Sequence, residues 1–129
     1  IATRKGYELS SETLSKIESS DISFSTTNDP KEAVTEADVV YTDTWVSMGD
    51  ESTRKKRLSD FNGFQINSTL LSKTEALVMH CLPAHRNEEI STDILDGDRS
   101  LVWTQAENRL HAQNGLLVHL LNPIQDLLK

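Results

Sequence analysis

The residues best suited to chemistry in this sequence follow a short apolar stretch. Residues 76–79 read Ala-Leu-Val-Met, and a run without polar alternation is typical of a parallel strand covered on both faces. The imidazole of His80 and the chain's one thiol, Cys81, come directly after it, and Pro83 prevents further strand pairing. Because ligands bind at the carboxyl ends of strands in open α/β sheets, this turn is a candidate site.

Two further segments place polar side chains at the same edge. Residues 38–42 are β-branched and aromatic, which predicts a strand that ends at Asp43. The loop containing Ser47 and Met48 follows that strand, and Arg109 lies in the first turn or two of the predicted final helix. All of these positions fall on the carboxyl side of the predicted sheet, so we expect them to face one crevice.

These groups form a chemically coherent set for binding an amino acid and an anion. Asp43 can bind an ammonium group, and the backbone of the loop that follows can hold an amino-acid head group. The Cys81 thiol and the Leu82 carbonyl can form hydrogen bonds with a second amine, and the Arg109 guanidinium can form hydrogen bonds with an anionic oxygen. Each residue taken alone has an ordinary structural explanation as a buried thiol, a turn residue or an ion-pair partner. When the residues are considered together, a role in binding is as well supported as a purely structural role.

Other chemistries have weaker support. His80, Cys81 and His85 lie near one another, but their spacing is not that of a usual zinc site, so we predict no metal. Adjacent residues on a strand point to opposite faces, and His80 is therefore not expected to activate Cys81 as a nucleophile. No glycine-rich nucleotide-binding motif is present, and no cofactor is predicted.

Composition restricts the remaining possibilities. The 129 residues suffice for one domain with a core, and a net charge of −7 argues against binding nucleic acid through its phosphates. No apolar run approaches the roughly 20 residues of a membrane span. One cysteine excludes an internal disulfide. The start, Ile1-Ala2, resembles the tail of a strand and lacks Met, so we expect the chain to begin inside a larger protein.

Strand and helix signals alternate along the chain with short connections. This alternation predicts a single α/β domain, a doubly wound, mostly parallel, Rossmann-like sheet with helices on both faces. The predicted strands are 22–25, 38–42, 64–66, 76–79 and 100–103. The predicted helices are 11–17, 30–36, 51–61, a short one after Asn67, 91–95 and 105–121. Residues 10–12 offer caps for the first of these helices, and Asp29 is the predicted cap of the second, with Pro30 at its first position. The last helix should begin at the cap Thr104, and its predicted inward face includes Ala106, Leu110, Leu117 and Leu121.

Three segments, in this order and spacing, resemble the ornithine carbamoyltransferases of the aspartate/ornithine carbamoyltransferase family. Residues 37–49 read Ala-Asp-Val-Val-Tyr-Thr-Asp-Thr-Trp-Val-Ser-Met-Gly, and residues 79–86 read Met-His-Cys-Leu-Pro-Ala-His-Arg. Residues 105–113 read Gln-Ala-Glu-Asn-Arg-Leu-His-Ala-Gln. The resemblance extends over about residues 1–121, and the first two motifs are highly specific.

The resemblance implies roles for the candidate residues. In this family the Asp-x-Trp-x-Ser-Met-Gly loop closes over the amino-acid substrate. The His-Cys-Leu-Pro turn meets the substrate's side-chain amine and the carbamoyl group, and the arginine of the third motif helps to bind carbamoyl phosphate. The roles implied here are catalytic for Cys81 and Arg109, and substrate-binding for Asp43, Ser47, Met48, Cys81, Leu82 and Arg109.

The match is to the C-terminal half of the family. The Ser-x-Arg-Thr and His-Pro-x-Gln motifs of the N-terminal domain are absent from this sequence. The resemblance therefore implies that residues 1–129 are an ornithine-binding domain without its carbamoyl-phosphate domain, and that this chain alone is inactive.

The resemblance also implies the reaction and setting of the parent protein. L-ornithine and carbamoyl phosphate would be its substrates and citrulline and phosphate its products, without a cofactor, in arginine biosynthesis or the urea cycle. The parent would be a homotrimer or higher homo-oligomer, located in the cytoplasm, or in mitochondria or plastids in a eukaryote. Two alternatives stay open: a carbamoyltransferase for another amine, such as putrescine or acetylornithine, and a non-catalytic interaction domain of the same fold.

Overall fold

The centre of the fold is a pair of parallel strands. The computed structural model describes residues 1–47 and 49–121. Strand β1 (Val39–Thr42) pairs with β2 (Leu77–His80) in a register that places Val40 beside Val78 and Thr42 beside His80. Val40 and Val78 are both buried, whereas Val39 and Leu77 are exposed, so the alternate positions of each strand face the core. The predicted α/β class with parallel strands is confirmed.

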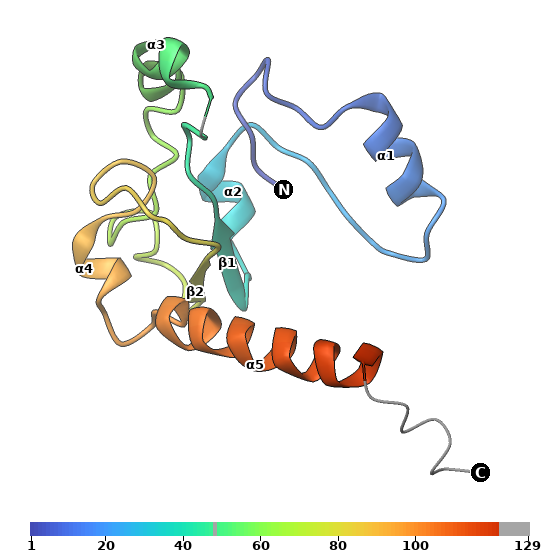
Figure 1. The fold of residues 1–129 in the computed structure, drawn as a ribbon. Coiled ribbons are helices and arrows are strands. Elements are labelled where there is room, and N and C mark those ends of the chain that lie inside the picture. The colour runs from blue at the N-terminus through green and yellow to red at the C-terminus, as the bar shows by residue number, and fades with distance from the viewer. Residues whose placement is uncertain (48, 122–129) are drawn as a thin grey trace.

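Helical segments precede, connect and follow the two strands (Figure 1). Two helix starts follow from local capping as predicted: the Ser10 hydroxyl accepts from the Thr13 backbone N–H, and the Asp29 carboxylate accepts from that of Lys31, with Pro30 in the first turn. The helices of the described residues are α1 (Ser11–Glu18), α2 (Pro30–Val34), the 3₁₀ helix η1 (Glu51–Thr53), α3 (Arg54–Asp60), α4 (Thr92–Leu95) and α5 (Val102–Leu121).

Three predicted strands, 22–25, 64–66 and 100–103, were wrong. The structure forms isolated parallel bridges beside or within these segments, joining Ala2 to Thr27, Ile66 to Ile90 and Val78 to Ser100. The third segment pairs with β2 for one residue only, because helix α5 begins at Val102. The short helix predicted after Asn67 was also wrong: residues 68–73 form turns, with the Asn67 side chain accepting from the Leu70 N–H. A β-propensity pattern cannot distinguish a strand from a single bridge, because the difference depends on a distant partner.

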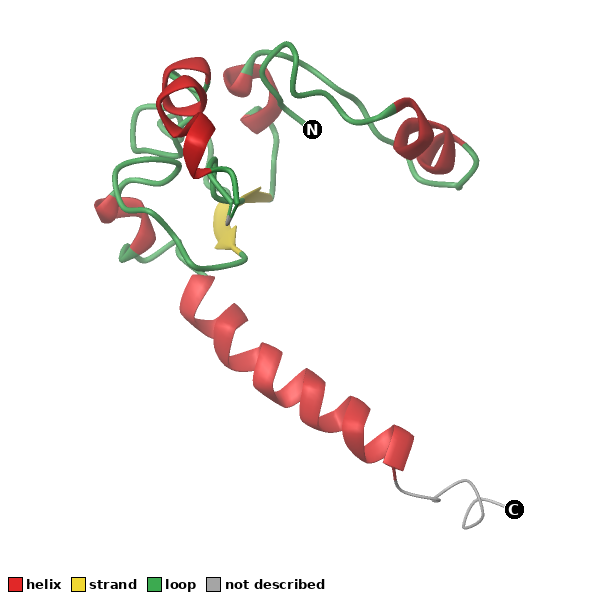
Figure 2. Cartoon of the chain, turned by 45° about the horizontal axis from the view of Figure 1, so that its top comes forward, coloured by secondary structure: helices red, strands yellow, loops and turns green. Residues whose placement is uncertain are grey.

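The predicted inward face of the last helix was also wrong. Ala106 is exposed, and Leu110, Leu117 and Leu121 are 59%, 53% and 78% exposed. Helix α5 starts at Val102 rather than after Thr104 and extends away from the strands, and α1 also lies apart from them (Figures 1 and 2). Within the described part of α5, only the beginning packs against the core, and Val102 is fully buried there. No helix in the described part of the chain has the length and apolar character needed to cross a lipid bilayer.

The core lies around the strand pair and anchors both strands. Its aliphatic side chains come from α2, both strands, the turns after Asn67, helix α4 and the start of α5. They remove apolar surface from water, which is the main favourable term in folding. Both strand ends that carry the candidate residues therefore rest on one packed cluster, made of Val34, Val40, Ile66, Leu70, Leu71, Ala76, Val78, Ile90, Ile94, Leu95 and Val102.

Candidate functional site

The two strands bring Asp43 and Cys81 into direct contact. Because Thr42 is paired with His80 in a parallel register, the residues that follow them emerge side by side. The Cys81 thiol donates a hydrogen bond to the Asp43 carboxylate, with 2.8 Å between Sγ and Oδ1. The same Oδ1 accepts from the Thr44 backbone N–H at 2.6 Å. Two predicted site residues that are 38 positions apart in sequence thus form one polar contact at the carboxyl edge.

The surroundings of Cys81 keep its thiol protonated. Desolvation, followed by the hydrogen bond to Asp43 and the negative charge of that carboxylate, raises the pKa of Cys81 to about 11. At neutral pH the sulfur is therefore a hydrogen-bond donor and not a thiolate. Since the thiolate is the nucleophilic form of cysteine, this geometry fits a residue that orients a substrate better than one that forms a covalent intermediate.

Slow alkylation of Cys81 is the expected consequence. At pH 8 the thiolate fraction should be on the order of a hundredfold below that of a free cysteine with a pKa of about 8.5. The higher pKa restores about tenfold in intrinsic nucleophilicity, so we expect iodoacetamide to react on the order of tenfold more slowly. The rate should keep rising toward pH 11.

Mass spectrometry of this single-cysteine chain between pH 7 and pH 11 measures that rate. The same chain unfolded in guanidinium chloride is the control, because its thiol lacks both the burial and the Asp43 contact. A profile of the folded chain that levels off near pH 8.5 would contradict the assignment.

An open groove of about 580 Å³ connects Cys81 to Arg109. Arg109 lies about two turns beyond the start of α5, with its side chain exposed. Cys81, Leu82 and Arg109, all predicted to be functional, therefore line one cavity. The other lining residues are Pro83, Ala84, Arg86, Leu95, Trp103 and Ala106.

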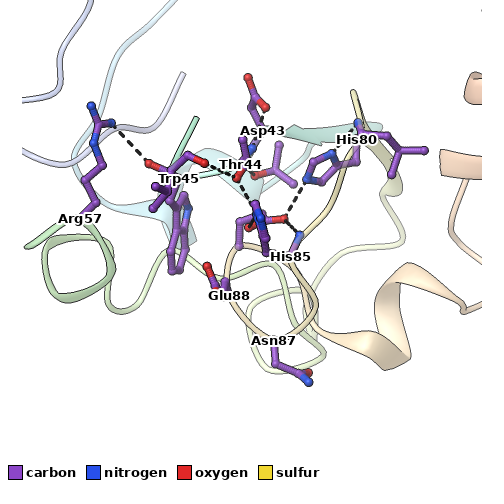
Figure 3. A network of polar contacts seen from close by, with 12 residues as sticks. Asp43, Thr44, Trp45, Arg57, His80, His85, Asn87 and Glu88 are labelled. Carbon is purple, nitrogen blue, oxygen red and sulfur yellow. Dashed lines mark hydrogen bonds and ion pairs between the residues drawn. The ribbon is translucent and has the colours of Figure 1, made fainter. Parts of the chain in front are cut away.

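The loop that follows β1 is held by Arg57 of α3. One Arg57 Nη lies 3.4 Å from the Trp45 carbonyl (Figure 3), and the other forms an ion pair of 2.9 Å with Asp50. Asp43, Trp45 and Arg57 line a second cavity of about 430 Å³. Ser47 lines neither of these two cavities, and its carbonyl accepts from the Asp50 N–H at 3.0 Å. Met48 lies outside the described residues.

A buried histidine and carboxylate support the turn from within, which the sequence did not predict. His80 Nε2 lies 3.1 Å from Glu89 Oε1, and both side chains are fully buried. His80 Nδ1 accepts from the Leu82 backbone N–H at 2.9 Å. Residues 85–89 read as a polar loop in the sequence, and two adjacent glutamates give no signal that the second is buried. The Sγ of Cys81 lies 3.8 Å from His80 Nδ1, whose lone pair is directed to Leu82.

His85, Glu88 and Glu89 form the one group of potential metal ligands found in the described part of the chain. Their ligand atoms lie within 4.8 Å of one another. His85 Nδ1 is 2.8 Å from the Thr44 hydroxyl (Figure 3), and Glu88 forms an ion pair with Arg54. One oxygen of each carboxylate has no hydrogen-bond partner. A cation bound here would compete with Arg54 and Thr44, so we assign no metal to the group.

Comparison with known proteins identifies relatives of the whole chain. Residues 1–120 match the family described as "Aspartate/ornithine carbamoyltransferase, Asp/Orn binding domain". The chain is 50% identical over 122 residues to an ornithine carbamoyltransferase of Haloquadratum walsbyi, covering 95% of this chain and 41% of that protein.

Solved structures show the same fold. The ornithine carbamoyltransferase of Pyrococcus furiosus superposes with a TM-score of 0.80 at 44% identity, over 91% of this chain and 39% of that one. The anabolic ornithine carbamoyltransferase of Campylobacter jejuni gives 0.82 at 36% identity, over 95% and 43%. These matches confirm the predicted α/β fold.

The chain spans about two fifths of the length of these relatives. The matched residues 1–120 contain both strands, the two residues Asp43 and Cys81, and all but the last residue of the helix that carries Arg109. It confirms the resemblance carried by the three sequence motifs. With 120 of its 129 residues matched, the chain belongs to the aspartate/ornithine carbamoyltransferase family.

Proposed function

We propose that the protein carrying this chain transfers a carbamoyl group from carbamoyl phosphate to the δ-amine of L-ornithine, and that this chain supplies the ornithine-binding half. The observation that carries the proposal is the contact of Cys81 with Asp43 beside the groove that Arg109 lines. The name ornithine carbamoyltransferase, borne by relatives of up to 50% identity over nearly the whole chain, supports the choice of substrate.

The chemistry places the substrate amine as the nucleophile. Asp43 holds the ammonium form of the substrate, and Cys81 and the Leu82 carbonyl orient the δ-amine after it loses its proton. The amine nitrogen forms a bond to the carbamoyl carbon, and the bond from that carbon to the phosphate oxygen breaks. Phosphate departs with the electron pair and takes the proton that the attacking nitrogen releases. Arg109 helps to stabilise the anionic phosphate. No metal or organic cofactor enters the proposal, because positioning two substrates supplies most of the rate enhancement.

The loop after β1 is proposed to hold the amino-acid head group. Ser47 and Met48 would contact the α-amino and α-carboxyl groups through their backbone, which favours a free α-amino acid over putrescine. The ion pair between Asp50 and Arg57 joins the end of this loop to α3. The wider proposals are a homotrimeric or larger parent protein, a role in arginine biosynthesis or the urea cycle, and a location in the cytoplasm or in a eukaryotic organelle.

Substrate competition in the full-length parent protein tests the proposal. We expect citrulline formation with L-ornithine to exceed carbamoylation of putrescine by at least about a hundredfold in kcat/KM, because putrescine has no α-carboxyl group and leaves the polar groups of the loop that would hold it unpaired. N-acetylornithine, which lacks the free α-ammonium, should be discriminated against similarly. Product formation is measured by chromatography.

Two outcomes would contradict the proposal. Equal rates with ornithine and putrescine would favour a carbamoyltransferase for another amine. Absence of transfer together with absence of ornithine binding in calorimetry would favour a non-catalytic interaction domain.

A further inference from the structure

Glu89 is a fully buried carboxylate in a loop of otherwise polar, accessible residues. Burying a carboxylate away from water is unfavourable unless hydrogen bonds compensate for the lost solvation. Glu89 Oε1 has two such contacts: His80 Nε2 at 3.1 Å and the His85 backbone N–H at 2.5 Å. Both contacts use the same oxygen and join the two ends of the segment that carries the site.

The hydrogen bonds determine the tautomer of His80. The Leu82 backbone N–H can only donate, so His80 Nδ1 must accept this bond with its lone pair. The ring proton is therefore on Nε2, from which it is donated to Glu89 Oε1. His80 is thus a neutral bridge between a buried carboxylate and the backbone of the turn.

The part of the turn held by this bridge is strained. Leu82 has a φ of 54°, in the left-handed region that side chains larger than glycine's rarely adopt. Such a conformation persists only when the surroundings specify it. The hydrogen bond from Leu82 N–H to His80 is a contact that fixes this residue. Along the chain, Cys81 precedes the Leu82 N–H and the Leu82 carbonyl follows it. These are the two groups proposed to orient the amine.

We propose that Glu89 is a positioning residue for carbamoyl transfer, which acts through His80 on the turn containing Cys81 and Leu82. The inference rests on the proposed function and deepens it. Glu89 does not line the groove that contains Cys81 and Arg109, so it acts on the amine only through the geometry of the turn. A purely structural Glu89 would affect stability but would leave the tautomer of His80 and the kinetics of the folded enzyme unchanged.

Three variants of the full-length protein separate these roles. Glu89→Gln keeps an oxygen that can accept from both His80 and His85, and removes only the charge. Glu89→Met has a similar length and offers no oxygen. Glu88→Met is the matched control, because the Glu88 carboxylate pairs with Arg54 and makes no contact with His80.

The expected kinetic effects differ sharply between the variants. Glu89→Met should lower kcat/KM for ornithine on the order of a hundredfold, mainly through kcat, because misplacing reacting groups by about 1 Å has that effect. Glu89→Gln should stay within about tenfold of the wild type, because one neutral hydrogen bond replaces a charge-assisted one. Glu88→Met should change kcat/KM by less than about threefold, because it removes a partly buried ion pair with Arg54 and no contact with the turn.

Two readouts do not require transferase activity. Nitrogen-15 NMR of the His80 ring should show the Nε2–H tautomer in the wild type and in Glu89→Gln, and a mixture of tautomers in Glu89→Met. The rate at which iodoacetamide modifies Cys81 should change most in Glu89→Met, because only that variant releases the turn. Glu89→Gln should raise the rate slightly, because the charge of Glu89 makes a small contribution to the raised pKa of Cys81. If the wild type forms no citrulline, the proposed function fails, while these two measurements still decide the role of Glu89.

Three outcomes would overturn the inference. The first is a wild-type His80 that carries its proton on Nδ1. The second is a folded Glu89→Met variant with wild-type kcat/KM and alkylation rate. The third, which applies even if Glu89→Met does not fold, is a folded Glu89→Gln variant whose kcat/KM falls on the order of a hundredfold although its oxygen still accepts from His80.

Discussion

The 129-residue chain by itself is expected to form citrulline at least on the order of a thousandfold more slowly than a complete carbamoyltransferase. Arg109 is the predicted phosphate-binding residue in this chain, and the Ser-x-Arg-Thr and His-Pro-x-Gln motifs of the family are absent from the sequence. Each charge-assisted hydrogen bond that such motifs make to a leaving phosphate contributes about 1.5–3 kcal/mol. Loss of three or more corresponds to a rate decrease of at least on the order of a thousandfold.

The measurement is citrulline formation by the purified chain at saturating ornithine and carbamoyl phosphate. The Pyrococcus furiosus relative, 44% identical in the matched region, is a suitable positive control under the same conditions. A rate for the isolated chain within tenfold of that relative would show that Arg109 and the groove suffice, and would refute the assignment of the phosphate site to another part of the protein.

Replacing Asp43 with asparagine in the full-length protein should lower kcat/KM for ornithine by about a hundredfold. The Asp43 carboxylate accepts the hydrogen bond of the Cys81 thiol, and removing a charged partner of an ammonium is worth about 1.5–3 kcal/mol. The amide oxygen of the new side chain would still accept from the Thr44 N–H, so the backbone of the turn should persist. The pKa of Cys81 should fall toward its ordinary value without reaching it, because desolvation, the larger cause of the raised pKa, remains.

Asp38→Asn is the matched control for Asp43→Asn. Asp38 is an exposed aspartate at the amino end of the same strand, where its carbonyl accepts from Leu77. The Asp38→Asn substitution removes the same charge at the opposite end of the strand, and kcat/KM should stay within about threefold of the wild-type value. Equal losses in the two variants would mean that Asp43 acts through the net charge of the domain and not through the substrate amine.

The functional motifs could be predicted because their geometry depends on neighbouring residues and on one pairing rule. Parallel pairing of β1 with β2 places the residue after each strand at the same edge, so Asp43 and Cys81 meet. The predicted helix starts at Ser10 and Asp29 are also confirmed, since a cap uses a side chain and a backbone N–H two or three residues away. The position of Ser47 relative to a substrate stays a prediction.

The residue pattern alone was enough to predict the two parallel strands, their order along the chain, the caps at Ser10 and Asp29 and the family to which the motifs belong. Three other features became known only from the folded chain: Glu89 is buried against His80, Ser100 forms one bridge and no strand, and the apolar side of α5 is exposed. These features depend on which distant segments surround a residue. A glutamate is stable inside the protein only if donors from elsewhere reach it, and an apolar helix face is buried only if the fold brings a partner to it.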